Sequence, residues 1–231
     1  FAKQAGHTVT ACLPSLVALE CREGFCGEAM GLSLRNCALK VTDTKTGKQV
    51  YSDFGEMLFT HFGVSGPMIL SASAHMRNME PCRYEIYVDM KPALDDEKLD
   101  ARILREMSEN SNKAVSNLVG LLLPRAIINP VVRLSGIKNS TKCNQLTKEE
   151  RKRLVHTIKN LKLTVLRFRP ISEAVITSGG ADVNEISPKT MESKLCGNLY
   201  FAGEVIDVDA YTGGFNLQIA FSTGFAAGNA Q

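Results

Sequence analysis

Hydrophobic and polar positions alternate along the first part of the chain. Leu32 and Leu34 alternate with polar residues, and Leu39 and Val41 do so again, as is typical of half-buried β-strands. The stretch DTKTGKQV supplies a turn at Gly47 between two such segments. Residues 7–60 are therefore predicted to be β-rich, and RYEIYVDM returns to the same alternation.

The pattern becomes helical over 95–160. The acidic opening LDDEKLDARILREMSEN suits the positive end of a helix dipole. Pro124 and Pro130 are expected to break NKAVSNLVGLLLPRAIINPVVRL into two short helices. Thr147 and Glu150 have the spacing of a capping box, which predicts a third helix start.

The order of these patterns predicts an α+β fold in which a helical subdomain is inserted into a β-rich, barrel-like domain. Strand patterns resume in LKLTVLRF and EAVITSGG. The predicted organisation has four parts, which are a first β-rich part, a helical insert, returning strands and a C-terminal segment, at 1–93, 94–160, 161–187 and 188–231.

The C-terminal segment contains LYFAGEVIDVDAYTGGFNLQIAFSTGFAAG at 199–228. It predicts a short buried parallel strand at 199–202, an acidic loop, a Gly-Gly pair and a helix. Gly213 and Gly214 let the backbone approach a ligand closely, and the helix start offers free N–H groups. The pattern alone leaves two interpretations open, a ligand site and a simple left-handed turn before a buried helix.

Three stretches carry a resemblance to a known family: GEMLFTHFGVSGP, VITSGGADVNEISPKTMESK and LYFAGEVIDVDAYTGGFNLQIAFSTG. In this order they resemble the HI0933-like, or YhiN-like, family of bacterial FAD-dependent oxidoreductases, which includes aminoacetone oxidase and a bile-acid reductase. Small departures are Ala181, where valine is usual, and Ala210, where glycine is usual. The resemblance implies a Rossmann-like FAD-binding domain that is split around a barrel-like domain and its helical insert.

The Gly-rich fingerprint G-x-G-x-x-G is absent from the sequence. The chain also begins at Phe1, in what looks like the end of an element. The resemblance therefore implies a truncated chain that lacks the N-terminal dinucleotide-binding part. That missing half is an expected partner, and the chain alone is expected to be inactive.

The resemblance also implies a set of cofactor-binding residues. Gly203 and Glu204 correspond to a glycine–acid step that receives hydroxyl groups of FAD, and Asp207 lies in the same loop. The helix start would face the pyrimidine side of the flavin ring, and TSGG would lie near the flavin. These two stretches contribute Gly213, Gly214, Phe215, Asn216, Leu217, Ser178, Gly179 and Gly180.

A histidine and a serine near 55–67 raise a separate question. The stretch FGVSGP is a near miss for the nucleophile elbow G-x-S-x-G, and Ser65 is better explained as a helix cap before Pro67. His61 is the candidate catalytic residue, because a histidine beside a flavin handles protons, although a structural role is the commoner one. The histidines and carboxylates show no metal-ligand spacing.

Charge is unevenly distributed. Residues 95–160 contain 13 Lys/Arg and 8 Asp/Glu, yet no Phe, Tyr or Trp. Because single-stranded bases stack on aromatic side chains, a solvated helical surface is favoured over nucleic-acid binding. No apolar run is long enough for a membrane helix, and the seven scattered cysteines suit a reducing, cytoplasmic protein. Neither a nucleic acid nor a membrane is expected as a partner, and the oligomeric state is left open.

The leading hypothesis is part of an FAD-dependent oxidoreductase that transfers hydride between a small organic substrate and flavin N5. NAD(P)H is a candidate electron donor, and oxygen a candidate acceptor. The alternative is a catalytically silent structural or protein-interaction domain. In that case the helix after Gly214 would leave an exposed apolar patch and favour self-association.

Overall fold

The computed structural model describes residues 1–230, so Gln231, the last residue of the predicted 188–231 segment, lies outside the described residues. The chain forms two compact units. We call residues 19–68 and 78–167 the barrel unit, and residues 1–18, 69–77 and 168 onward the terminal unit.

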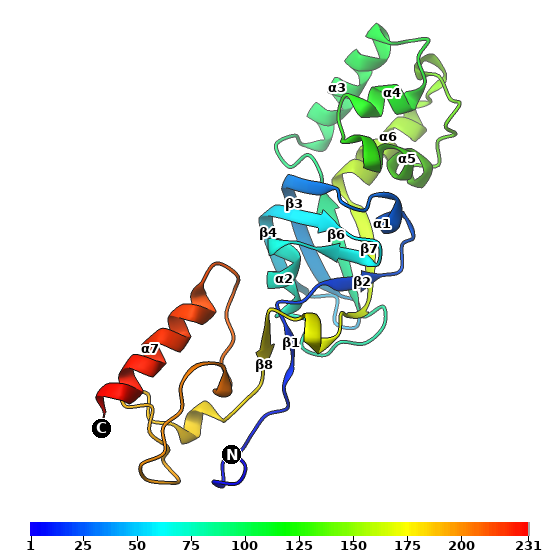
Figure 1. Cartoon of the computed structure of the whole chain (residues 1–231). Coiled ribbons are helices and arrows are strands. Elements are labelled where there is room, and N and C mark those ends of the chain that lie inside the picture. Colours follow the sequence, from blue (N-terminus) through cyan, green and yellow to red (C-terminus); the bar gives the residue numbers. More distant parts are fainter. Residues whose placement is uncertain (231) are drawn as a thin grey trace. The chain divides into compact units, whose positions relative to one another are not determined.

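The barrel unit is built on a closed barrel, which confirms the predicted barrel-like domain (Figure 1). All described pairs in it are antiparallel. Around the barrel the strands are β2 (Leu19–Cys21), β5 (Gly63–Ser65), β4 (Gln49–Phe59), β3 (Ser33–Asp43), β6 (Tyr84–Asp89) and β7 (Leu161–Phe168). Closure pairs every strand on both sides, so the barrel has no free edge.

The alternating pattern in the sequence becomes the inside of this barrel. Side chains that are at most 2% exposed fill it, among them Leu39, Val41, Met57, Phe59, Ile86, Val88, Leu161 and Leu163. The predicted turn between β3 and β4 is confirmed, and Gly47 adopts φ +69° there. The β3–β4 register shifts between Leu34 and Cys37, a bulge that leaves Arg35 and Asn36 outside the ladder.

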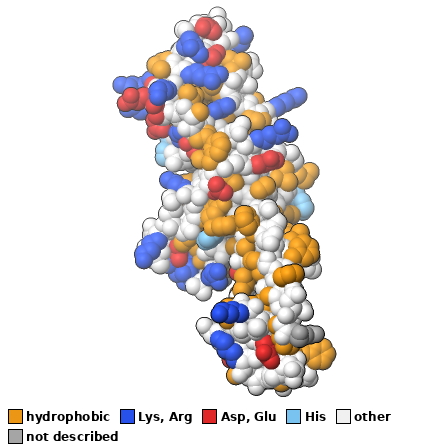
Figure 2. All heavy atoms as spheres, turned by 90° about the vertical axis from the view of Figure 1, so that its left-hand side faces the viewer, with side chains coloured by type: hydrophobic (Ala, Val, Ile, Leu, Met, Phe, Trp, Pro, Cys, Tyr) orange, Lys and Arg blue, Asp and Glu red, His pale blue; other side chains and the backbone are white. Residues whose placement is uncertain are grey.

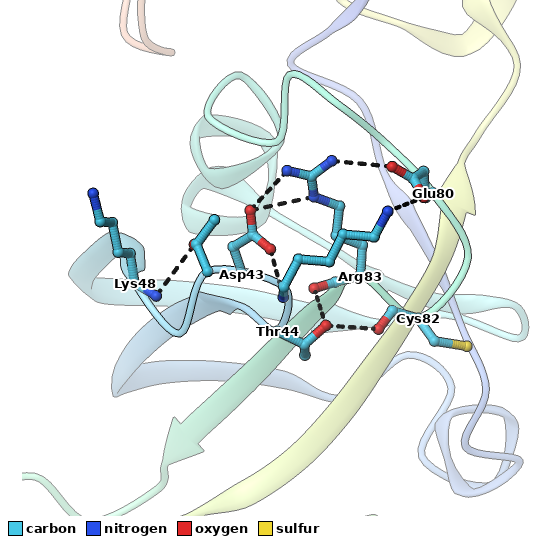
Figure 3. Close-up of polar contacts among 8 residues, drawn as sticks. Asp43, Thr44, Lys48, Glu80, Cys82 and Arg83 are labelled. Atoms are coloured by element: carbon cyan, nitrogen blue, oxygen red, sulfur yellow. Dashed lines mark hydrogen bonds and ion pairs between the residues drawn. The ribbon is translucent and has the colours of Figure 1, made fainter.

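A cluster of charged groups fixes the β3–β4 turn to the segment before β6 (Figure 3). The Arg83 guanidinium donates to the Asp43 carboxylate at 2.9 Å and to Glu80 at 3.1 Å. The Asp43 carboxylate also accepts from the Lys45 backbone N–H at 2.9 Å. Arg83 holds the pKa of Asp43 below its usual value. The carboxylate of Asp43 is thus fully engaged within the fold, so we assign this cluster a structural role.

The predicted helical insert lies between β6 and β7 and consists of α3 (Asp96–Glu109), α4 (Val115–Gly120), α5 (Arg125–Leu134) and α6 (Lys148–Lys159). A further short helix, α1 (Phe25–Glu28), precedes β3. The Asp95 side chain caps α3, and Thr147 with Glu150 forms the predicted capping box of α6. Buried residues such as Leu99, Ile103, Leu118, Ile127 and Leu154 form the core of this block.

One helix boundary was predicted wrongly. Pro124 precedes α5 as expected, but Pro130 lies inside that helix instead of ending it. Pro130 is buried between the fully buried residues Ile127 and Val131. Apolar burial on this face therefore outweighs the one backbone hydrogen bond that a proline removes.

The terminal unit contains a two-stranded antiparallel sheet of β1 (Leu13–Ser15) and β8 (Ile176–Ser178). It also contains most of α2 (Pro67–Ser73), which begins at the predicted proline, and α7 (Phe215–Asn229). Ser65, the expected cap of α2, is the last residue of β5. A small core of Ala181, Ile186, Phe201 and Ile206 lies under the loops between β8 and α7.

A buried histidine ties the N-terminal segment to this core. The two ring nitrogens of His7 lie 3.0 Å from the Glu185 carboxylate and 2.7 Å from the Ser193 hydroxyl. The Ser193 hydroxyl also accepts from two backbone N–H groups, those of Leu195 and Cys196. Because the His7 side chain is 0% exposed, this carboxylate–histidine–serine arrangement is a structural tie with no access for a substrate.

The parallel strand predicted at 199–202 does not form. Tyr200 makes a single antiparallel bridge with Glu192, and the flanking backbone bonds join Ser193 to Leu199 and Phe201 to Met191. A buried parallel strand needs neighbouring strands on its flanks, and the described residues beside this segment offer only one short antiparallel partner. The segment therefore closes a local hairpin.

Candidate functional site

The loop before α7 is held in an unusual conformation by glycines. Gly203, Gly213 and Gly214 have φ values of +71°, +107° and +90°, where a side chain would be strained. No side chain caps α7, whose first N–H groups are therefore available to a ligand. Open space lies where a Cβ of Gly214 would project. The helix start is thus bare and accessible, as an electron-rich ligand atom would require.

Polar side chains of the predicted site fix this loop from within. The Asp207 carboxylate accepts from the Gly179 N–H at 3.1 Å. The Asn216 side chain both accepts from and donates to the backbone of Ala210, each at 2.9 Å. Asp207 and Asn216 therefore shape the loop, whereas the Glu204 side chain is exposed beside it.

The TSGG turn after β8 is packed against the protein's own backbone. Ser178 is the last residue of β8 and lies opposite Leu13. A Cβ on Gly179 would come within 2.3 Å of the Ala11 carbonyl oxygen, and one on Gly180 within 2.6 Å of the Val205 carbonyl oxygen. Close approach of three chain segments is sufficient to explain both glycines.

The structure adds a pair that sequence reasoning missed. The imidazole Nε2 of His75 lies 3.0 Å from the Tyr211 hydroxyl, and the two rings are 5.6 Å apart between centroids. Tyr211 is 47% exposed and lies between Asp207 and Gly213 in the same loop. His75 and Tyr211 are 136 positions apart in the sequence, so no local pattern links them and the pair could not be predicted.

The surroundings of His75 favour its neutral form. Burial, together with the nearby Arg77 cation, lowers the pKa of His75, while the Asp209 carboxylate raises it. The Asp209 carboxylate accepts from the Ser15 hydroxyl at 2.7 Å and lies 3.8 Å from the Arg77 guanidinium. A neutral imidazole bonded to a phenol can accept a proton from that hydroxyl, and the imidazolium that forms at lower pH can return one.

His61, the histidine singled out from the sequence, belongs to the barrel unit. It lies in the exposed turn between β4 and β5 and makes an edge contact with Phe62 at 4.9 Å between ring centroids. Its catalytic role stays a prediction.

Comparison with known proteins places the chain in a family. The family described as "HI0933-like protein barrel and H2TH domain" matches residues 13–176. The chain belongs to the HI0933-like family. The match spans β1, the barrel and the helical block and ends at the first residue of β8, which confirms the resemblance seen in the sequence.

Three curated relatives of this HI0933-like chain are enzymes. It is 28% identical to a 3-dehydro-bile acid delta(4,6)-reductase of Clostridium scindens, over 99% of this chain and 56% of that protein. It is 29% identical to a ribosomal RNA dihydrouridine synthase of Escherichia coli, over 74% of this chain and 40% of that protein. The corresponding synthase of Haemophilus influenzae is 30% identical over 84% and 46% of the two chains. The chain thus spans about half the length of these relatives.

Helix α7 of the HI0933-like chain exposes an apolar face. Leu217, Phe221 and Phe225 are spaced four residues apart along it and are 63%, 71% and 74% exposed. Figure 2 shows the side of the molecule on which α7 lies in Figure 1, and hydrophobic side chains are visible in the lower half of that view. Across the described residues, no helix is long and apolar enough to cross a membrane. The exposed patch expected from the sequence is therefore present on α7.

Replacing Phe221 and Phe225 together by serine is expected to lower self-association of the isolated chain. Exposed apolar area favours association, and removing two exposed rings costs little folding free energy because neither side chain is buried. Sedimentation velocity at several protein concentrations measures the first effect, and urea unfolding the second. Replacing the exposed Leu104 of α3 by serine is the control, with no expected change in association. Equal self-association of the wild-type chain and the Phe221/Phe225 double variant would contradict the prediction.

Proposed function

We propose that the chain is part of a flavin-dependent oxidoreductase, with FAD bound at the loop 203–214 and the start of α7. The observation that carries the proposal is the bare helix start behind two left-handed glycines, Gly213 and Gly214, with an exposed carboxylate at Glu204. The names of the relatives support the oxidoreductase class, because a reductase and the synthases each act by adding hydrogen to their substrate.

The residues present fit a flavin by their chemistry. The N–H groups of Phe215, Asn216 and Leu217 and the helix dipole favour negative charge, which a reduced flavin ring develops. The Glu204 carboxylate suits hydroxyl groups of the cofactor's chain. Asp207, Gly179 and Gly180 contribute by holding the loop, and Gly203 packs beside Ala220 of α7. In this proposal 188–230 completes a Rossmann-like domain whose other part covers the apolar face of α7.

The reaction we propose is the reduction of a carbon–carbon double bond conjugated to a carbonyl group. A bound reduced flavin would supply the hydride. Tyr211 would donate the proton to the neighbouring carbon, and His75 would hold the Tyr211 hydroxyl in place and return a proton to it. One carbon of the double bond takes the hydride and the other takes the proton, which completes the reduction.

The proposed substrate is defined by this conjugated double bond. A small organic enone and a uracil base within RNA both contain it, and the relatives' names include a bile acid and a ribosomal RNA. NAD(P)H as the electron donor stays a prediction. The competing hypothesis, a silent interaction domain, requires that flavin is absent from the whole protein as well.

Flavin content tests the proposal. Both this chain and the longer protein that the proposal implies would be purified, and flavin absorbance measured per protein. We expect flavin in the longer protein, and a loss of about tenfold in affinity when Glu204 is replaced by alanine, the size of one hydrogen bond to a charged group. The matched control is Glu149→Ala on the exposed surface of α6, which should retain flavin. Absence of flavin from both wild-type preparations would refute the proposed function.

A further inference from the structure

A groove in the barrel unit is lined by polar and aromatic groups that the proposed function does not use. One hollow of about 600 Å³, within the usual range of ligand sites, is lined by Asn36, Phe54 and Met90–Leu94. A second hollow is lined by Ser33–Cys37, Met90, Lys91, Leu123 and Pro124. The two share Asn36, Met90 and Lys91, so we treat them as one feature, the bulge groove.

The β3 bulge creates this groove. The register shift between Leu34 and Cys37 displaces Arg35 and Asn36 from the ladder, and both side chains are exposed. The segment after β6 contributes Lys91 to the lining of both hollows. The α4–α5 connection contributes Pro124 to the second hollow, and Arg125 follows it directly.

The groove is positively charged and lacks a compensating acid. No carboxylate lines either hollow. Burial, and secondly the nearby Arg102 cation, lowers the pKa of Lys91. The buried Nε of Arg102 makes no hydrogen bond among the described residues, and its ion-pair partner is the Glu106 carboxylate at 3.9 Å. Over 110–148, which includes the α4–α5 connection, the sequence contains no Asp or Glu at all. Arg35 and Lys91 line the groove and no carboxylate does, which favours a bound anion there.

An aromatic side chain completes the groove. Phe54 of β4 is 60% exposed and borders the first hollow together with Pro92 and Leu94. The expectation that the chain does not bind nucleic acid depended on the lack of aromatic residues within 95–160. The fold brings an aromatic residue to the edge of that basic block from elsewhere in the sequence. Figure 2 shows Lys and Arg side chains over the block itself, in the upper part of the view, with acidic side chains between them.

We propose that the bulge groove binds a single-stranded segment of RNA, with a backbone phosphate on Arg35 and Lys91 and a base stacked on Phe54. Phosphates are bound by Lys and Arg, and unstacked bases by aromatic faces. The choice of RNA over DNA rests on the proposed function, in which an RNA base is one substrate class. The groove itself depends only on the barrel unit.

Fluorescence anisotropy with a labelled oligouridine of about ten nucleotides, without flavin or reductant, tests this. Phe54→Ala is expected to weaken binding about tenfold, while Phe54→Trp retains it. Lys91→Gln and Arg35→Gln should each weaken binding and lower the slope against log salt concentration by about 0.7. Lys152→Gln is the control, because Lys152 lies beside Asp96, Glu97 and Asp100, away from the groove.

Thermal melting verifies that each variant folds, which we expect because Phe54, Arg35 and Lys91 are not buried. The proposal is overturned if the wild-type chain does not bind the RNA, if Phe54→Ala binds like Phe54→Trp, or if Lys152→Gln weakens binding as much as Lys91→Gln. Equal affinity for oligothymidine DNA would overturn the assignment to RNA. Because no cofactor is used, these results are independent of the flavin measurement.

Discussion

Replacement of Tyr211 by phenylalanine is expected to slow substrate reduction by about 100-fold or more, with flavin content unchanged. Phenylalanine keeps the ring that contacts His75 but removes the hydroxyl that lies 3.0 Å from its Nε2. General acid catalysis by a positioned side chain contributes on the order of 10²–10⁴ in rate. Stopped-flow oxidation of the prereduced longer protein by substrate measures the chemical step directly.

The pH dependence of the same step identifies the role of His75. Burial lowers the pKa of His75 below its usual value of about 6.5, so its imidazolium forms only at lower pH. If the imidazolium resupplies the Tyr211 proton, the rate rises as pH falls through that pKa. His75→Gln keeps a hydrogen-bonding group but cannot titrate, so this limb of the profile is expected to disappear.

Two measurements separate catalysis from a structural role. Tyr200→Phe removes a hydroxyl elsewhere in the terminal unit and should leave the rate unchanged. Proton NMR of the cofactor-free chain reports the His75 titration, which should shift in Tyr211→Phe because the phenol is its hydrogen-bond partner. A normal reduction rate in Tyr211→Phe would eliminate the proton-donor role.

Features of the fold that depend on neighbouring residues were predictable from the sequence. The β-strand character around Leu34, Leu39 and Val41, the turn at Gly47 and the Thr147–Glu150 capping box all appear as expected, although the bulge between the two alternating parts of that strand was not predicted. The prediction that Pro130 ends a helix was wrong, because burial of a whole helix face decides whether a proline is tolerated. The prediction of a parallel strand at 199–202 was wrong, because such a strand depends on neighbouring strands that no local pattern reveals.

The candidate site divides in the same way. Glycines with positive φ at 213 and 214 were readable, since a Gly-Gly pair before a helix has a direct conformational reason. His75 with Tyr211, and Phe54 with Lys91, were not readable, because each pair joins distant segments. Chemistry made by tertiary contacts was therefore the part that the sequence left open.

Gly180→Ala is expected to lower the free energy of unfolding by about 3 kcal/mol or more, even without any cofactor. The new Cβ would lie 2.6 Å from the Val205 carbonyl oxygen and 2.9 Å from the Asp207 nitrogen. Gly180 also adopts φ +144° and exchanges backbone hydrogen bonds with Thr10 at 2.9 and 3.2 Å. Backbone strain and overpacking each cost about 1–3 kcal/mol, and the neighbours here are backbone atoms that cannot rotate away.

Urea unfolding followed by circular dichroism measures this effect. Gly197→Ala is the matched control, because nothing lies within 4 Å of its Cβ position, so its midpoint should stay near that of the wild type. The pair distinguishes two explanations of the TSGG stretch. If Gly180 were required only for contact with a flavin, the cofactor-free variant would unfold at the wild-type urea concentration. A large loss of stability instead means that this glycine acts by letting the segments at Thr10 and Val205 approach, and so contributes to the site by holding the Asp207 loop in place.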